Sequence, residues 1–134
     1  HDGSMGTVHA NSPAEAVTRM TSLVTMGFPS LQPEVIGRMM ASSIDVIVQV
    51  DRLRDGSRKV TQISELISDS DGELGLHNIM VFAFGKQDAD QDARVTGDHR
   101  FVNRPVGQLL ARAQYYGELD NLNRILQGGG AGAQ

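Results

Sequence analysis

The sequence DVIVQVDRLRDGSRKVTQISELI, residues 45–67, decides the fold that we expect for this chain. Residues 45–53 and 58–67 are rich in β-branched residues, as strands usually are. Between them, Asp55 and Gly56 form a dipeptide that is typical of a tight hairpin turn. The stretch therefore predicts two antiparallel strands joined by a short turn.

A second turn and a third strand follow the hairpin. Asp71 and Gly72 mark the turn, and residues 74–84 have the length and composition of a strand. Its apolar face would carry Leu74, Leu76, Met80, Phe82 and Phe84. In the first strand of the hairpin, one face would carry Val46, Val48 and Val50, and the other Gln49 and Asp51. We therefore predict a meander of three antiparallel strands.

Two helices are expected before this meander. Ser12 can cap the first helix, and Glu15 occupies the capping-box position. Pro13 suits the first turn, Gly27 suits the end, and Pro33 opens the second helix. The expected apolar faces are Ala16, Val17, Met20, Leu23 and Val24 in the first helix, and Val35, Ile36, Met39 and Met40 in the second. This order of elements places the chain in the α/β class.

The composition changes after the third strand. Residues 85–99 contain the acidic run DADQD and are predicted to form an exposed loop. Pro105 opens a helix that Gly117 would close, and residues 118–126 suit a further short helix. Residues 128–134 form a glycine-rich tail that we expect to be disordered. The chain is thus divided into residues 1–84, 85–127 and 128–134.

The overall composition excludes several classes of protein. The chain has 134 residues, of which 40% are apolar and 21% charged, as in a globular protein of one domain at most. Its net charge of −4 argues against a nucleic-acid partner, because phosphate binding needs a basic surface. The absence of cysteine excludes disulfides and thiolate metal sites. The longest apolar run, residues 79–84, is far too short to span a bilayer.

The chain also lacks the motifs that ATP hydrolysis needs. A phosphate-binding loop has the pattern G-x-x-x-x-G-K-[ST], which does not occur here. Lys59 lies in the predicted hairpin, and Lys86 precedes Gln87 where a Ser or Thr is required. The best candidate for an acidic magnesium-binding strand is interrupted by Gln49, and its Asp51 fits the flank of the hairpin. We therefore expect this polypeptide to be inactive towards ATP on its own.

The N-terminal stretch HDGSMGTVHANSP, residues 1–13, resembles the histidine box of the secretion-type traffic ATPases, the RecA-like motors of type II and type IV secretion. The likeness is greatest to the CpaF-like branch, which powers tight-adherence pilus assembly. It continues in the same order through EAV at residues 15–17 with RM at 19–20, ASSIDVIVQ at 41–49 and RLRDGSRKV at 52–60, and it extends to ISE at 63–65. The resemblance covers roughly the first two thirds of the chain.

This resemblance implies that the chain is the C-terminal part of a RecA-like P-loop ATPase domain, with the phosphate loop and the acidic strand upstream. In the intact motor, ATP and Mg²⁺ are the expected ligands. The family assembles as a homo-hexamer on the cytoplasmic face of the inner membrane, as a peripheral protein. There it couples ATP hydrolysis to a membrane platform protein that assembles pili or exports proteins. The chain alone is not expected to bind nucleotide tightly.

The resemblance also assigns the N-terminal loop to the γ-phosphate of the nucleotide. The expected catalytic residues are His1 and His9, and the expected nucleotide-binding residues are Gly3, Ser4, Thr7 and Arg58. Imidazole and hydroxyl groups can hydrogen-bond a phosphate oxygen or the attacking water. The loop would therefore sense or position the γ-phosphate.

The histidines have structural alternatives. Residues 7–10 suit a short strand, in which His9 would be hydrogen-bonded within the core, and His1 would be a frayed end. A metal site at His1, Asp2 and His9 matches no standard spacing and lacks a third firm ligand, so none is predicted. His77 and His99 are expected to be surface or packing residues.

The arginines and methionines have structural alternatives as well. Arg52, Arg54 and Arg58 would form a solvated hairpin tip, with their charge offset by Asp51 and Asp55. Contact with the nucleotide base or with an adjacent subunit is the functional interpretation of the same arginines. Helix-face methionines are expected to fill the core, namely Met20, Met26, Met39 and Met40.

Two other functions compete with the motor. The first is a non-enzymatic α/β interaction or regulatory module of a secretion or pilus machine, and the second is a degenerate gene fragment without activity. The chain opens on His rather than Met, which favours a piece of a longer protein. A coding frame that continues upstream into a phosphate loop would distinguish the motor from the module.

Overall fold

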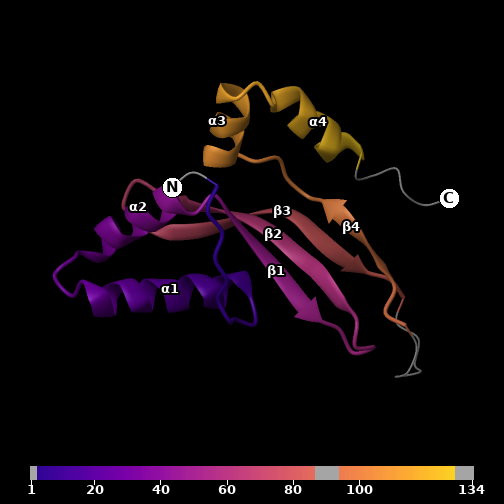
Figure 1. The fold of residues 1–134 in the computed structure, drawn as a ribbon, viewed down its shortest axis with the longest axis horizontal. Coiled ribbons are helices and arrows are strands. Elements are labelled where there is room, and N and C mark those ends of the chain that lie inside the picture. The colour runs from indigo at the N-terminus through magenta and orange to yellow at the C-terminus, as the bar shows by residue number, and fades with distance from the viewer. Residues whose placement is uncertain (1–2, 87–93, 129–134) are drawn as a thin grey trace.

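The computed structural model describes residues 3–86 and 94–128 of the chain (Figure 1). The helices are α1 (Pro13–Gly27), α2 (Pro33–Ser43), α3 (Gln108–Tyr115) and α4 (Leu119–Gly128). The strands are β1 (Val46–Arg52), β2 (Arg58–Ser68), β3 (Leu74–Phe84) and β4 (Gly97–Phe101). The predicted α/β class, with two helices before an antiparallel meander and helices after it, is confirmed. The acidic run of the predicted loop, residues 88–92, and all but the first residue of the predicted disordered tail lie outside the described residues.

The predicted hairpin is present as β1 and β2. Gly56 has a φ of +81°, which a glycine adopts without strain, and the Leu53 nitrogen lies 2.8 Å from the Ser57 oxygen. The pairing of β1 with β2 shifts between Gln49 and Val50, so β2 carries one extra residue there. The side chain of Gln49 is buried, whereas Val50 is 54% exposed. The polar face of β1 is therefore the covered one.

Within the described residues, the sheet has four strands in the order β1-β2-β3-β4, one more than predicted. Residues 97–99 belong to the predicted loop of residues 85–99, and this part of the prediction is wrong, because residues 97–101 form a strand. They pair with β3 from Met80↔Phe101 to Phe84↔Gly97. The strand GDHRF has no apolar alternation, because it lies at the sheet edge and is mostly exposed. Gly97 is required for its close approach, since an added Cβ would lie 2.7 Å from the Phe82 ring.

The two N-terminal helices cover one face of the sheet. Ser12 caps α1 as predicted, with its Oγ accepting a hydrogen bond of 3.1 Å from the Glu15 backbone. Buried Ile36 and Met40 of α2 pack against Leu66 of β2 and form the core. Partly buried residues extend this cluster, namely Val17, Met20, Val24, Leu31, Ile44, Leu74 and Leu76.

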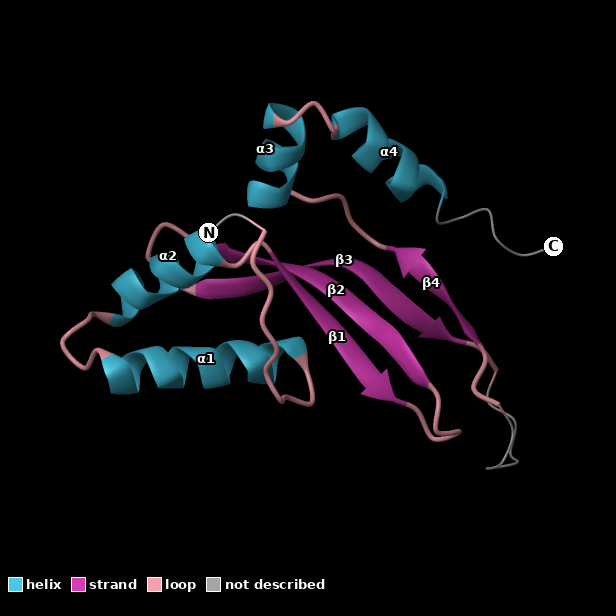
Figure 2. Cartoon of the chain, viewed as in Figure 1, coloured by secondary structure: helices cyan, strands magenta, loops and turns pink. Residues whose placement is uncertain are grey.

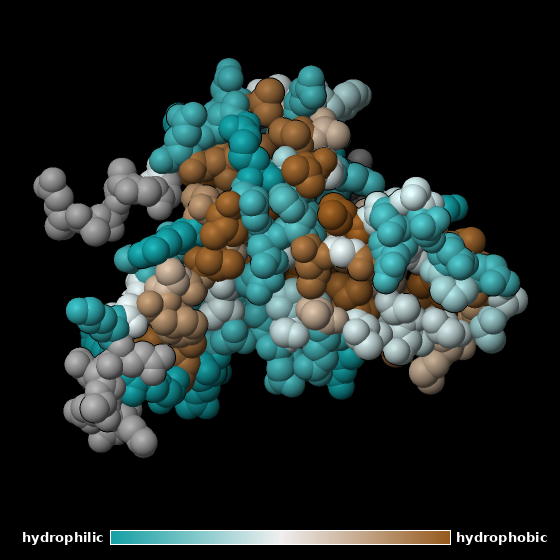
Figure 3. All heavy atoms as spheres, turned by 180° about the vertical axis from the view of Figure 1, so that it is seen from behind, coloured by the Kyte–Doolittle hydropathy of each residue, from teal (hydrophilic) through white to brown (hydrophobic). Residues whose placement is uncertain are grey.

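The buried faces of the helices are narrower than predicted. Leu23 is 63% exposed, Val35 39% and Met39 49%, although all three belong to the predicted apolar faces. Met26 is 78% exposed and does not fill the core. The sheet is too small to cover the whole predicted apolar face of each helix. In the space-filling view from behind (Figure 3), apolar residues are accordingly visible across the middle of the molecular surface.

A pair of glycines sets the position of α2. A Cβ added to Gly37 would lie 1.8 Å from the backbone oxygen of Gly72, in the turn between β2 and β3. Gly72 itself has a φ of +80°. The helix backbone therefore lies directly on the turn, which only glycine permits at residue 37.

The C-terminal helices approach the opposite face of the sheet (Figure 2). Consecutive residues of a strand point to opposite faces, so Glu65 lies on the face opposite Leu66. The helix predicted to begin at Pro105 begins instead at Gln108. The backbone N–H groups of Val106 and Gly107, which precede the helix, bind the Glu65 carboxylate. These bonds hold the two residues outside the helix.

None of the described helices is long and apolar enough to cross a membrane.

Candidate functional site

The loop before α1 carries most of the predicted site residues. Residues 7–10 were predicted to form a short strand, but the structure shows an extended segment without strand pairing. No neighbouring backbone in the described part of the chain pairs with it, so its ladder hydrogen bonds cannot form. Thr7 and His9 are exposed, and the alternative that His9 is a buried core residue is therefore wrong.

Hydrogen bonds from three side chains hold the segment around His9. Arg19 of α1 donates to the backbone carbonyl of His9. Gln49 of β1 lies with its Nε2 3.5 Å from the backbone carbonyl oxygen of Ala10. Glu15 accepts two bonds of 3.0 Å from the backbone and the side chain of Asn11. The segment is thus attached through its backbone, and the His9 side chain stays exposed.

The hydrogen bonds from Asn11 also affect the ionisation of the Glu15 carboxyl group. The backbone hydrogen bond from Asn11, followed by the side-chain bond from the same residue, lowers the pKa of Glu15. The nearby charge of Arg19 acts in the same direction. A hydrogen-bonded carboxylate is more stable in its ionised form. Glu15 therefore remains an acceptor for Asn11 throughout the neutral pH range.

A polar network connects this segment to the hairpin. The Gln49 side chain, 8% exposed, donates to Oδ1 of Asp51 at 2.7 Å. Thr61 of β2 donates its hydroxyl to the other carboxylate oxygen of Asp51. The sequence indicated these residues only as an interruption of an apolar strand and a hairpin flank. A glutamine inside a valine-rich run was the one available signal for the network.

A second polar cluster lies between β2 and β3. Ser64 is fully buried and donates to Asn78 at 2.9 Å, and Gln62 donates to both residues at 2.8 and 2.7 Å. Each donor has an acceptor, as buried polar groups require. The cluster is therefore a satisfied structural network, and no pattern in the sequence indicated it.

The two aspartates at the hairpin, Asp51 and Asp55, make hydrogen bonds within the described structure. Asp55 accepts hydrogen bonds from the Ser57 hydroxyl at 2.6 Å and from the backbone N–H of Val95 at 2.8 Å. These bonds, with the Ser57 hydroxyl contributing most, lower the pKa of Asp55 to about 2. Asp51 is bound by Gln49 and Thr61. Asp55 therefore links the hairpin turn to the backbone before β4, and Asp51 links side chains of β1 and β2.

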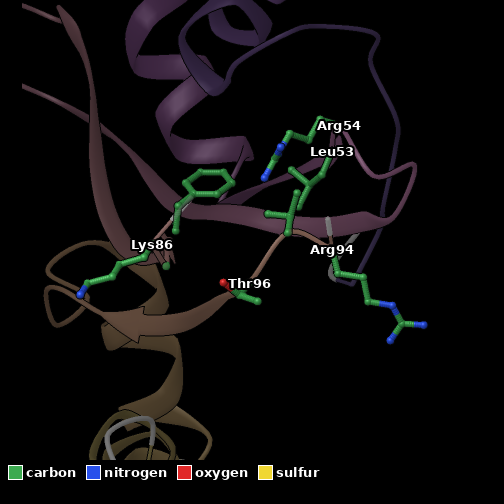
Figure 4. A pocket seen from close by; sticks show the side chains of 8 residues that line it. Leu53, Arg54, Lys86, Arg94 and Thr96 are labelled. Carbon is green, nitrogen blue, oxygen red and sulfur yellow. The ribbon is translucent and has the colours of Figure 1, made fainter. Parts of the chain in front are cut away.

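A hollow of about 180 Å³ lies between the turn that joins β1 to β2 and the segments that follow β3 and precede β4 (Figure 4). It is lined by Leu53, Arg54, Phe84, Gly85, Lys86, Arg94, Val95 and Thr96. The side chains of Lys86 and Arg94 extend in different directions and do not converge on one point (Figure 4). The hollow is therefore poorly suited to holding a small anion.

The predicted site residues lie in two separate parts of the structure. Gly3, with a φ of +81°, lies in a turn, and Ser4, Thr7 and His9 follow it along the exposed loop. Arg58 is the exposed first residue of β2, and no hydrogen bond between described residues connects it to this loop. His1 lies outside the described residues. Within residues 3–86 and 94–128, no cluster of three His, Asp or Glu residues is arranged to hold a metal ion.

The remaining histidines have structural contacts. The Nε2 of His77 lies 2.8 Å from the carbonyl oxygen of Arg104, and the Nε2 of His99 lies 2.9 Å from that of Val60. The His99 ring also packs against Phe82, with 5.2 Å between the ring centroids. Both agree with the predicted packing role.

Comparisons with known proteins identify partial relatives. Over 66 residues, which is 49% of this chain, the sequence is 36% identical to a protein named “Putative conjugal transfer protein” in each of two strains of Mycobacterium tuberculosis. The matched segment spans only 18% of the length of these relatives. No protein-family model matches the chain.

Proposed function

We propose that this chain is part of a motor that serves a conjugation or secretion machine. In the more specific form of the proposal, it is the C-terminal part of the RecA-like domain of a CpaF-like traffic ATPase. The similarity to conjugal transfer proteins supports the link to a transfer machine. The order of the four sequence blocks, from the histidine box to ISE, supports the more specific assignment.

The observation that carries the proposal is the exposed loop of residues 3–9. Its hydroxyl and imidazole groups, at Thr7 and His9, are exposed, and within residues 3–86 and 94–128 no core residue binds them. Such groups suit the γ-phosphate, because phosphoryl transfer depends on positioning and on charge stabilisation. The phosphate loop, the acidic strand and the Mg²⁺ ligands would come from another part of the motor.

The open edge of the sheet supports the same proposal. Within the described residues, β1 pairs only with β2, and Val48 and Val50 of β1 are 53% and 54% exposed. An edge strand with exposed valines is a template for further pairing. In the intact motor, the strands that carry the phosphate loop would continue the sheet at this edge.

The proposal includes the partners of the motor. The intact protein would act as a homo-hexamer, in the cytoplasm and peripherally at the inner membrane, on a platform protein of a pilus or secretion machine. Arg58 is exposed, and we propose it for a subunit contact or a nucleotide contact. A nucleic-acid partner is not proposed, because the chain carries a net charge of −4.

Steady-state ATP hydrolysis by the longer protein that contains this sequence tests the proposal. Replacing His9 with alanine should lower kcat by about 10²-fold, since a hydrogen-bond donor to the developing charge is lost. His99→Ala is the matched control, because His99 is exposed and bonds only a backbone carbonyl in the described structure. Equal kcat values for wild type and His9→Ala would refute the role of His9.

An interaction module without enzymatic activity is the second candidate. The exposed apolar residues of the sheet, Val48, Val50 and Phe84, favour it, because they suit contact with another protein. Absence of ATP hydrolysis in the longer protein, together with binding to a component of the machine that Val48→Asp abolishes, would support this candidate over the motor.

A further inference from the structure

Two side chains from different elements bind consecutive peptide carbonyls next to the exposed His9. Arg19 donates to the carbonyl of His9, and Gln49 donates to that of Ala10. We propose that Arg19 and Gln49 are positioning residues, which fix the backbone of residues 9–10 and thereby present the imidazole to a ligand. The identity of that ligand rests on the proposed function, whereas the fixing of the backbone does not.

These two bonds restrain the backbone of residues 9 and 10, in addition to the bonds from Asn11 to Glu15 next to them. The segment forms no strand ladder, and residues 3–9 are exposed. Successive carbonyls of an extended chain point in opposite directions, so a donor on each side restrains rotation of the intervening peptide. Arg19 supplies one donor from α1 and Gln49 supplies the other from β1.

Arg19 is itself held by its surroundings. It lies four residues after Glu15 on α1, which places the two side chains on one face of the helix. Glu15 is bound in turn by Asn11, two residues after His9. The guanidinium carries several donors in a rigid plane. Its bond to the His9 carbonyl is therefore directional.

The orientation of Gln49 is determined by Asp51. A carboxylate only accepts hydrogen bonds, so the amide of Gln49 must direct its nitrogen to Asp51, at 2.7 Å. The same nitrogen then faces Ala10 at 3.5 Å. Thr61 of β2 holds the second oxygen of Asp51. A displacement of the hairpin would thus reach the His9 segment through Asp51 and Gln49.

The test uses NMR relaxation of backbone amides in the 134-residue chain. The wild type should give order parameters of roughly 0.85 at residues 8–11, and Gln49→Met or Arg19→Met should reduce them below about 0.6. Methionine keeps the approximate length of each side chain but donates no hydrogen bond. Gln62→Met is the matched control, since Gln62 lies on the same sheet and bonds only Ser64 and Asn78 among the described residues. Unchanged order parameters in both test variants would overturn the proposal.

Kinetics of the longer protein separate this inference from the proposed function. If both hold, Gln49→Met should lower kcat about 10-fold with an unchanged KM for ATP, since only positioning is lost. If the order parameters fall but neither Gln49→Met nor His9→Ala changes kcat, the positioning stands and the motor function of the segment fails. If His9→Ala lowers kcat but Gln49→Met changes neither the order parameters nor kcat, only the positioning role of Gln49 fails.

Discussion

The carboxylate of Glu65 accepts a hydrogen bond of 2.8 Å from the backbone nitrogen of Val106, across 41 residues of sequence. Gly107 donates to the same carboxylate at 3.2 Å. Glu65 is only 1% exposed, and the two donors directly precede α3. A buried carboxylate at a helix N-terminus is stabilised by the helix dipole as well as by these bonds. It anchors the C-terminal helices to the sheet.

Glu65→Gln should therefore destabilise the protein. The oxygen Oε2 of Glu65 accepts from both backbone donors, so the amide can keep its oxygen there, but its NH₂ group would then face the Gly107 N–H. A buried N–H donor of the amide is left unpaired. The expected loss is about 1–3 kcal/mol in the free energy of unfolding, measured by urea denaturation. Glu73→Gln, at an exposed position in the turn before β3, is the control and should change this value by less than about 0.5 kcal/mol. Equal effects of the two substitutions would contradict the anchoring role.

Gly37→Ala should be strongly destabilising, because its Cβ would lie 1.8 Å from the Gly72 backbone oxygen. Relief of this clash requires α2 to move away from the turn, at a cost of at least about 2 kcal/mol. Gly27→Ala, at the end of α1, meets no atom within 4 Å and should change stability by no more than about 1 kcal/mol. Thermal or urea unfolding compares the two. A Gly37→Ala protein as stable as Gly27→Ala would show that α2 does not lie on this turn.

Asp55 makes the stability of the chain sensitive to acid. Its pKa is lowered from 3.8 to about 2 in the folded state, first by the Ser57 hydroxyl and then by the Val95 and Ser57 backbones. The ionised carboxylate therefore stabilises the fold above about pH 4, and this contribution is lost as the pH falls towards about 2. In Asp55→Asn, urea midpoints should fall less between these pH values than in wild type. Asp98→Asn, on the exposed edge strand, should follow the wild type; identical profiles for all three proteins would refute this role of Asp55.

Local chemistry explains which parts of the fold could be predicted from the sequence. The Asp55–Gly56 turn and the Ser12–Pro13 helix start depend on residues within a few positions of each other, so their signals are present in short stretches. Strand β4 depends on pairing with β3 and on the space at Gly97, neither of which shows in the polarity of GDHRF. The segment of residues 7–10 has strand composition but no partner strand among the described residues, so composition misled.

The residues of the candidate site also fall into those that the sequence identified and those that it did not. His9 and Thr7 were identified by their resemblance to a known motif, and the structure leaves both exposed. Gln49 and Asp51 were not identified, because their role arises from contacts with Ala10 and Thr61, far from them in sequence. Non-local hydrogen bonds of this kind have no pattern in a single sequence.

The central claim is that the exposed loop before α1 meets the γ-phosphate in the intact motor. The most direct measurement is a structure of the longer protein with a non-hydrolysable ATP analogue bound. The account predicts that the His9 imidazole or the Thr7 hydroxyl lies within hydrogen-bonding distance of the γ-phosphate or of the attacking water. A bound nucleotide with both side chains remote from its phosphates would contradict it.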